Sequence, residues 1–370
     1  MNETVKPSAA PAVKTAKVDV TRHGAVAALT LNRPEALNAF DDEMRQVFST
    51  EIPKIARNPD VYVVVLKSSS PKAFSAGGDV RALVKAAAAD QAVAASYFAG
   101  EYQLNWLLDC FSKPTVSLIN GLCMGSGAGL TCFNTHRVAG ENYKFAMPET
   151  AIGLFPDVGV AHPLARLPWP MGLYLGLSGR SIGRADAHWL GLVTHCVAGA
   201  QHGFILDQLA DSQPIDPLLD GLHEALPAGP LQAERAMIED LFSGGSIVEI
   251  MQRLRTASGA SAAFAEATYA DLAKRSPLSL VLTDRHIRSV RSLDLRETLI
   301  QDYRLALRCL KGRDFAEGVR AALVDKDGAP KWQHARVEDI TANEVASYFA
   351  SLGAEELNLL TRTEMQNARF

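Results

Sequence analysis

Residues 113–129, with the sequence KPTVSLINGLCMGSGAG, constrain the fold more than any other part of the chain. An apolar strand candidate at residues 115–119 is followed by a turn of small residues that begins at Gly125 and opens a helix. Such a turn leaves backbone N–H groups free at the start of the helix, where they can face an anion or a polarised carbonyl group. Close packing of the helix against a neighbouring element explains the small residues equally well.

Strand and helix patterns alternate through the first half of the chain. Residues 25–31 and 61–66 are short apolar runs typical of buried strands. Between them, residues 41–57 place apolar side chains at helical spacing, although Pro53 disfavours the last turn. A further helix is expected at residues 125–133. This alternation favours an α/β fold with a parallel sheet.

Strand-like runs largely disappear beyond about residue 205, and helical patterns take their place. We therefore divide the chain into a disordered lead (1–17), an α/β core (18–205) and a mostly helical C-terminal region (206–370). The clearest helical patterns of the last region are residues 234–242, 262–274, 278–290 and 295–310.

The composition excludes several classes of protein. The chain has 370 residues and a formal net charge of -4, so it lacks the basic excess of a nucleic-acid-binding protein. Its five cysteines form no CxxC pair and no ligand-spaced cluster with the histidines, which argues against a zinc site or a disulfide framework. No apolar run reaches the roughly 18 residues of a membrane span. Because the lead is poor in the Arg and Ser of a presequence, a cytoplasmic location is favoured over the mitochondrial matrix.

A second glycine turn follows another strand candidate. Residues 73–79, AFSAGGD, place Gly77 and Gly78 just before a helix. Taken alone this is a common loop. Two such turns after two strands are more informative, because a carbonyl oxygen that becomes an oxyanion is stabilised by two converging N–H donors.

Two carboxylates lie in the otherwise apolar segment 145–159, FAMPETAIGLFPDVG. Glu149 and Asp157 are eight residues apart, and carboxyl groups in apolar surroundings have raised pKa values that suit general acid or base catalysis. The alternative is structural. Glu149 would then occupy the first turn of a short helix behind Pro148 and favour its dipole, while Asp157 would form a turn.

Glu101 is a further candidate on a helix expected at about residues 91–110. It shares a face with Tyr97, Leu104 and Leu108, so a charged group lies on the apolar stripe of this helix. A side chain that reaches the rim of the apolar surface would explain this position without any function.

Four segments together resemble the signature segments of the enoyl-CoA hydratase/isomerase (crotonase) superfamily. The resemblance implies a spiral of ββα turns, a coenzyme A site, and an oxyanion hole formed by the backbone N–H groups of Gly78 and Ser126, with Gly125 in the substrate-binding turn. The family motif usually has Gly where Ser126 stands, but only the N–H group is needed. The segments are LNRPEALNAF (31–40), AFSAGGDV (73–80), KPTVSLINGLCMGSGAGL (113–130) and FAMPETAIGLFPDVG (145–159).

Within the superfamily, the chain resembles the 3-hydroxyisobutyryl-CoA hydrolase branch. Hydratases resemble one another in two glutamates that hold water, and these align with Gly129 and Glu149, so one of the two is absent here. The segment PETAIGLFPDVG is similar to that of the hydrolases, with Glu149 and Asp157 as the catalytic pair. Glu101 falls where that branch has a substrate-binding glutamate. Residues 311–332, KGRDFAEGVRAALVDKDGAPKW, extend the resemblance beyond the core.

The resemblance implies hydrolysis of a short acyl-CoA thioester, with 3-hydroxyisobutyryl-CoA of valine degradation as the expected substrate. No metal or other cofactor is expected, because coenzyme A is part of the substrate. Arg33 and Lys72 are candidate cations for its phosphates. Another crotonase-type hydratase or isomerase, and a non-catalytic structural relative, are the alternatives. A homo-oligomer is left open, because crotonase relatives often form trimers.

Overall fold

The computed structural model describes residues 16–368, so the predicted lead lies outside the described residues except for Ala16 and Lys17. The described chain contains two sheets. The larger sheet has the strand order β1-β2-β3-β5-β7-β10, and the smaller sheet has the order β4-β6-β8-β9. The strands of the larger sheet are β1 (Val18–His23), β2 (Val26–Leu31), β3 (Val63–Ser68), β5 (Thr115–Ile119), β7 (His136–Ala139) and β10 (His195–Cys196). Those of the smaller sheet are β4 (Ala73–Ser75), β6 (Leu122–Met124), β8 (Lys144–Ala146) and β9 (Ile182–Gly183).

The two strands of each consecutive pair belong to different sheets. In each of the pairs β3–β4, β5–β6 and β7–β8, the first strand joins the larger sheet and the second joins the smaller one. From β2 to β10 the larger sheet is parallel, whereas β1 is antiparallel to β2 and β9 to β8. Repetition of this pattern builds the predicted spiral of ββα turns, so the α/β crotonase-like fold class is confirmed.

The helices predicted in the first half are present with small shifts at their ends. Helix α1 (Asp42–Arg57) begins behind Asp41, whose side chain accepts a hydrogen bond from the backbone N–H of Met44. Pro53 lies inside this helix without ending it, contrary to the doubt about the last turn. Helix α3 (Gln91–Cys110) matches its prediction, and α4 (Ser126–Thr131) begins directly behind Gly125.

The C-terminal region is helical, as predicted. The helices α11 (Arg235–Phe242), α13 (Ala262–Leu272), α14 (Pro277–Ser289) and α15 (Leu295–Lys311) begin and end within two residues of the expected ranges. The expected boundary at residue 205 falls inside α8 (His202–Ala210). No helix within residues 16–368 combines the length and the apolar character needed to cross a bilayer.

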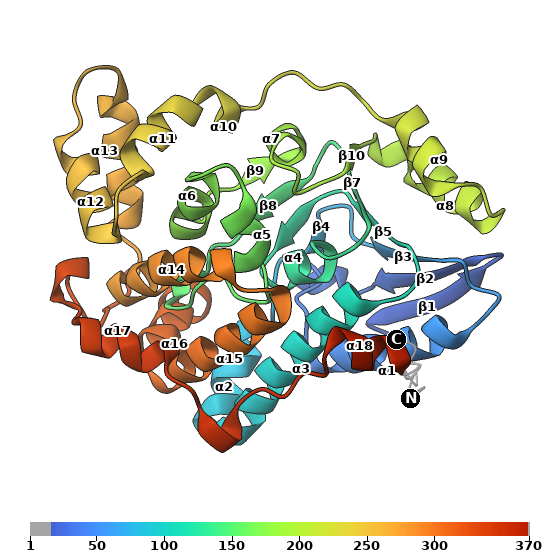
Figure 1. Ribbon diagram of the computed structural model, residues 1–370, viewed down its shortest axis with the longest axis horizontal. Helices are drawn as coiled ribbons and strands as arrows, with labels where there is room; N and C mark the ends of the chain where they lie inside the picture. The colour runs from blue at the N-terminus through green and yellow to red at the C-terminus, as the bar shows by residue number, and fades with distance from the viewer. Residues whose placement is uncertain (1–15, 369–370) are drawn as a thin grey trace, which may run out of the picture.

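The helices cover two different faces of the spiral. Helices α8 and α9 (Ile215–Leu222) pack on one face of the larger sheet through Ile205, Leu209 and Leu219. In Figure 1 these two helices lie at one edge, and a long connection leads from them across the top to α10 (Pro230–Ala233) and α11 on the opposite side. Helices α14, α15 and α16 (Arg313–Val319) lie below, beside α2 (Val80–Ala89) and α3.

Candidate active site

A cavity of about 310 Å³ lies where the two glycine turns, α3 and the C-terminal region meet. It contains every predicted catalytic, oxyanion-hole and substrate-binding residue, from four separate segments of the chain, but neither of the two candidate cations, Arg33 and Lys72. The predicted residues that line it are Gly78, Glu101, Gly125, Ser126, Glu149 and Asp157, and the other lining residues are Ala76, Gly77, Val80, Leu83, Tyr97, Phe98, Met124, Pro148, Ala151, Ile152, Leu154, Ala322 and Leu323.

The two glycine turns face each other closely. Gly125 has φ +47°, a backbone conformation that favours glycine, and a Cβ atom there would lie 3.3 Å from Cα of Gly77 and 3.1 Å from Oε1 of Glu149. A Cβ atom on Gly78 would lie 3.0 Å from Oγ of Ser126. Because Ser126 is the first residue of α4, its N–H group has no acceptor within the helix. The turns are therefore adjacent, and the Glu149 carboxyl group lies beside them.

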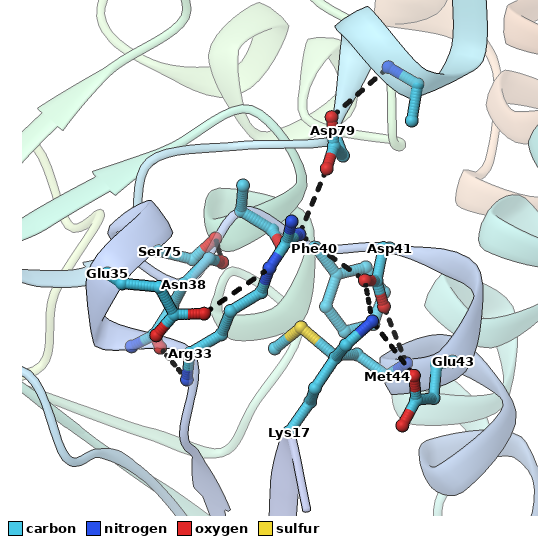
Figure 2. A network of polar contacts seen from close by, with 12 residues as sticks. Lys17, Arg33, Glu35, Asn38, Phe40, Asp41, Glu43, Met44, Ser75 and Asp79 are labelled. Atoms are coloured by element: carbon cyan, nitrogen blue, oxygen red, sulfur yellow. Dashed lines mark hydrogen bonds and ion pairs between the residues drawn. The ribbon is translucent and has the colours of Figure 1, made fainter. Parts of the chain in front are cut away.

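A network of charged side chains holds the turn that contains Gly78 (Figure 2). The Arg33 guanidinium group donates hydrogen bonds of 3.0 Å to Oδ2 of Asp79 and to the carbonyl oxygen of Ala39. Asp79 also caps α2 and donates its own N–H to the carbonyl oxygen of Phe40. Asp41 lies 3.3 Å from the same guanidinium group. A third carboxylate, that of Glu35, lies 3.9 Å from Nε of Arg33. Arg33, a predicted candidate for binding phosphate, is thus engaged by three carboxylates and anchors the turn.

Glu149 begins a short 3-10 helix, η2 (Glu149–Ile152), directly behind Pro148, as the structural alternative predicted. The same residue also lines the cavity with only 6% of its surface exposed. Burial raises the pKa of its carboxyl group to about 8, and the charge of Glu101 adds to this, while its own backbone N–H and Arg275 act in the opposite direction. Its buried Oε2 has no hydrogen-bond partner among the described residues.

Asp157 lies on a strained turn at the far end of the same segment. The hydroxyl group of Tyr102 donates a hydrogen bond of 2.7 Å to its Oδ2 atom. The next two residues, Val158 and Gly159, have φ values of +51° and +75°, and a β-branched residue in this region is a clear outlier. Burial, followed by the charge of Glu149, raises the pKa of the Asp157 carboxyl group well above its usual range.

Glu101 is buried on α3. The alternative prediction, that its side chain extends to the solvent-exposed rim of the apolar surface, is therefore wrong. Only 4% of its surface is exposed. Burial raises the pKa of its carboxyl group to about 7, against the hydrogen bond with Ser126 and the charge of Arg45. The sequence predicted a single apolar face for this helix, but α3 is buried on most of its sides from Gly100 onward.

Position 129 has no room for the second glutamate of hydratases. A Cβ atom on Gly129 would lie 2.8 Å from Cβ of Val158 and 2.9 Å from Nδ2 of Asn105. Real Cβ atoms almost never approach other atoms within 3.0 Å. The turn that carries Asp157 therefore occupies the space that this glutamate would need.

Several residues around the cavity were missed by sequence reasoning. Tyr102 belongs to none of the recognised motif segments. The only sequence signal for it is its position on an apolar helix, next to Glu101. Ala322 and Leu323 lie on a π-helical segment, η6 (Arg320–Val324), that reaches the cavity from the C-terminal region. Lys72, the other candidate cation, is exposed and does not line the cavity.

The arrangement suits acid–base chemistry at a carbonyl group. Two backbone donors can stabilise a negative charge on oxygen, and three buried carboxyl groups with raised pKa values stand beside them. The charge of Glu101 raises the pKa of Glu149, and the charges of Glu149 and Glu101 raise the pKa of Asp157.

Comparison with known proteins agrees with this geometry. Residues 26–349 match the family described as enoyl-CoA hydratase/isomerase. A mitochondrial 3-hydroxyisobutyryl-CoA hydrolase of Xenopus tropicalis is 38% identical over 94% of this chain and 92% of its own length.

Two solved structures have the same architecture. An enoyl-CoA hydratase from Rhodobacter sphaeroides is 35% identical with a TM-score of 0.86, over 93% of this chain and 100% of that chain. A carnitinyl-CoA dehydratase from Mycobacterium thermoresistibile is 33% identical with a TM-score of 0.87, over 93% of this chain and 99% of that chain. Since the matches span the glycine turns, the three carboxyl groups and the helical region beyond them, the chain belongs to the enoyl-CoA hydratase/isomerase family.

Proposed function

We propose that the protein hydrolyses 3-hydroxyisobutyryl-CoA to 3-hydroxyisobutyrate and coenzyme A, a step of valine degradation. The observation that carries this proposal is the meeting of Glu149 and Asp157 in one cavity with the turns of Gly78 and Ser126. The resemblance to the named hydrolase supports the choice of substrate.

The thioester carbonyl would lie between the N–H groups of Gly78 and Ser126. These donors would stabilise the charge that develops on its oxygen, and loss of one such donor typically slows a reaction by ~10²–10³. Gly125 supports this geometry, because a side chain there would meet Gly77 and Glu149. The Arg33–Asp79 contact keeps the Gly78 turn in place.

Glu149 would deliver the oxygen that replaces sulfur. In one route its carboxylate takes a proton from water, the resulting hydroxide adds to the carbonyl carbon, and the C–S bond breaks as the thiolate leaves with the proton. In the other route the carboxylate itself adds, the thiolate leaves, and water then hydrolyses the anhydride. Both routes use the free Oε2 atom of Glu149 and end in the same acid and thiol.

Asp157 would bind the 3-hydroxyl group of the acyl chain and orient the attacking water or carboxylate. Burial and the charge of Glu149 raise its pKa well above its usual range, which favours the protonated form, and a protonated carboxyl group can donate a hydrogen bond to this hydroxyl group. Glu101 would add a polar contact at the same end of the cavity. The reaction as proposed consumes water and the acyl-CoA alone, so it calls for no metal and no other cofactor.

Hydration or isomerisation of an enoyl-CoA is the second candidate, because solved relatives are named as a hydratase and a dehydratase. The crowding around Gly129 argues against it, since the paired glutamate has no space there. A non-catalytic relative would have no reason to keep three carboxyl groups buried in a cavity, where each lowers stability unless it is satisfied.

A panel of acyl-CoA esters tests the proposal. Release of free thiol from 3-hydroxyisobutyryl-CoA, faster than from crotonyl-CoA or acetyl-CoA, is the expected result. Loss of the enoyl absorbance of crotonyl-CoA without thiol release would instead assign hydration. An absence of turnover with every ester of the panel would favour the non-catalytic alternative.

The location and the assembly of the protein stay predictions. The cytoplasmic location predicted from the sequence has no support from the relative named above, which is mitochondrial. We propose no nucleic-acid partner, given the net charge of -4, and leave the homo-oligomer as an expectation to be tested by sedimentation.

A further inference from the structure

A fully buried pair, His286 and Asp302, lies behind the turn that carries Asp157. Nε2 of His286 on α14 is 2.7 Å from Oδ1 of Asp302 on α15, and both side chains have 0% exposure. Burial of an ionisable pair is costly, and replacement by apolar side chains is often neutral or stabilising. An explanation in terms of stability alone is therefore weak, and the contacts of the pair indicate another role.

Each member of the pair contacts the catalytic segment on a different side of Asp157. The second oxygen of Asp302 accepts a hydrogen bond of 2.7 Å from the backbone N–H of Gly159. The ring of His286 packs edge-on against Phe155, with ring centroids 5.3 Å apart. The pair thus brackets residues 155–159, in which Val158 and Gly159 both have positive φ.

The orientation of the histidine ring is fixed from its other side. Nε2 of Gln301 lies 2.9 Å from Nδ1 of His286 and donates a hydrogen bond of 2.7 Å to Oγ of Ser289. With the amide group donating to Nδ1, the proton of the ring is at Nε2, the atom that lies 2.7 Å from Oδ1 of Asp302. The two groups are in close polar contact, although neither atom has a hydrogen-bond partner among the described residues. The ring therefore packs against one oxygen of Asp302, while the other oxygen accepts the hydrogen bond from Gly159.

We propose that Asp302 and His286 are positioning residues for Asp157, which hold the strained turn so that its carboxyl group faces Glu149 across the cavity. The inference rests on the proposed function. It gives the helical C-terminal region a part in the reaction, because both residues come from that region while Asp157 comes from the core. Neither residue lines the cavity, so neither is expected to touch the substrate.

The Asp302→Asn variant tests the inference, with Asp284→Asn as the matched control. Asp284 lies on α14, is mostly buried and accepts a hydrogen bond of 3.2 Å from the backbone N–H of Ile247, but it does not line the cavity. We expect kcat of the Asp302 variant to fall by about 10- to 100-fold, with KM changed less than about threefold, because a small misplacement near the reacting groups is costly. The control should keep the kcat of the wild type.

The pH–rate profile of Asp302→Asn provides a second measurement. A purely structural role of Asp302 would leave this profile unchanged. Glu149, Glu101 and Asp302 face Asp157 as carboxyl groups and raise its pKa, and Tyr102 donates to it. Removal of the Asp302 charge lowers the pKa of Asp157, so the limb of the profile that reports Asp157 should move to lower pH. An unchanged limb together with an unchanged kcat would overturn the inference.

Two variants of His286 keep the test decisive if the Asp302 variant does not fold. His286→Gln keeps a polar group beside Asp302 and should keep most of the activity, whereas His286→Leu removes this polar contact and should lose the activity. Equal kcat values for these two variants would contradict positioning.

Hydrogen–deuterium exchange separates this inference from the proposed function. The peptide that contains residues 155–159 should exchange faster in Asp302→Asn than in Asp284→Asn, whatever the substrate of the enzyme. Exchange equal in the two variants would overturn the positioning role, while a wild type that releases no thiol from any ester would overturn only the proposed reaction.

Discussion

The hydroxyl group of Tyr102 lies 2.7 Å from Oδ2 of Asp157, so α3 restrains the turn that carries the second carboxyl group. The same helix supplies Glu101 to the cavity one residue earlier. Adjacent residues of one helix therefore contribute a carboxyl group and a support for another, which ties the positions of the Glu101 and Asp157 carboxyl groups to that of α3.

Replacement of Tyr102 by Phe should slow the reaction while the fold persists. The ring still packs against Phe98 and Tyr303, but Asp157 loses its donor, and a hydrogen bond of this kind contributes about 1–3 kcal/mol. Because the hydrogen bond lowers the pKa of Asp157, its loss should move the corresponding limb of the pH–rate profile to higher pH. Tyr174→Phe, which removes a hydroxyl group bonded to Arg180 away from the cavity, is the control. Identical profiles for both variants would contradict the role of Tyr102.

Replacement of Glu149 by Gln should abolish thiol release and leave binding of the acyl-CoA measurable. The amide has nearly the same shape but can neither accept the proton of water nor attack the carbonyl group. In the wild type, the pKa of about 8 predicts that kcat/KM rises with pH through a limb near that value, as the carboxylate forms. Thiol release by the variant at the rate of the wild type would remove Glu149 from the mechanism.

The same raised pKa values make the stability of the free enzyme depend on pH. Burial raises the pKa of Glu149 from 4.5 to about 8 and that of Glu101 from 4.5 to about 7. Between pH 4.5 and about pH 8, the folded state binds more protons than the unfolded state. The free energy of unfolding therefore falls as the pH rises through this range. We expect the Tm to decrease between pH 5 and pH 8, by less in Glu149→Gln, as measured by scanning calorimetry. A Tm equally dependent on pH in both proteins would contradict these pKa values.

Replacement of Arg33 by Met distinguishes two roles of this residue, that of an anchor for the Gly78 turn and that of a ligand for the phosphates of coenzyme A. The guanidinium group bonds Asp79 and lies near Asp41, so its loss should loosen the Gly78 turn and lower kcat. A phosphate ligand would mainly raise KM for the acyl-CoA, with kcat retained. Steady-state kinetics with 3-hydroxyisobutyryl-CoA distinguish these results, and a change confined to KM would restore the prediction made from the sequence.

The sequence predicted the main strands and helices because their patterns are local. The apolar runs of β2, β3 and β5 and the helical spacing of α1 and α15 depend only on neighbouring residues. The strands β4, β6, β8 and β9 have two or three residues each, too few for a period to appear. The smaller sheet was therefore not predicted from local patterns, and only the spiral of ββα turns implied by the resemblance pointed to paired strands.

The predicted site residues lie together, but their supports could not be predicted. Glu149 and Asp157 stand in recognisable segments, whereas Asp302 acts on Gly159 across 143 residues of sequence. A contact over such a distance has no local pattern. For the same reason, the sequence could not show that Arg33 contacts Asp79, which lies 46 residues away.

Replacement of Gly129 by Ala tests the packing that excludes the second glutamate. The new Cβ atom would lie 2.8 Å from Cβ of Val158 and 2.9 Å from Nδ2 of Asn105, and overpacking of this kind typically costs about 1–3 kcal/mol. Because Val158 follows Asp157, we also expect kcat to fall.

Gly221→Ala in α9 is the matched control, because no atom beyond the adjacent residues and the nearby backbone of the helix itself lies within 4 Å of the position of its new Cβ. It should stabilise the protein by about 0.4–1 kcal/mol through the unfolded state. Denaturant unfolding and thiol release measure both effects, and the larger Gly129→Glu should gain no hydratase activity. If Gly129→Ala were as stable and as active as the control, the crowding at position 129 could no longer explain why a hydrolase, rather than a hydratase, occupies this fold.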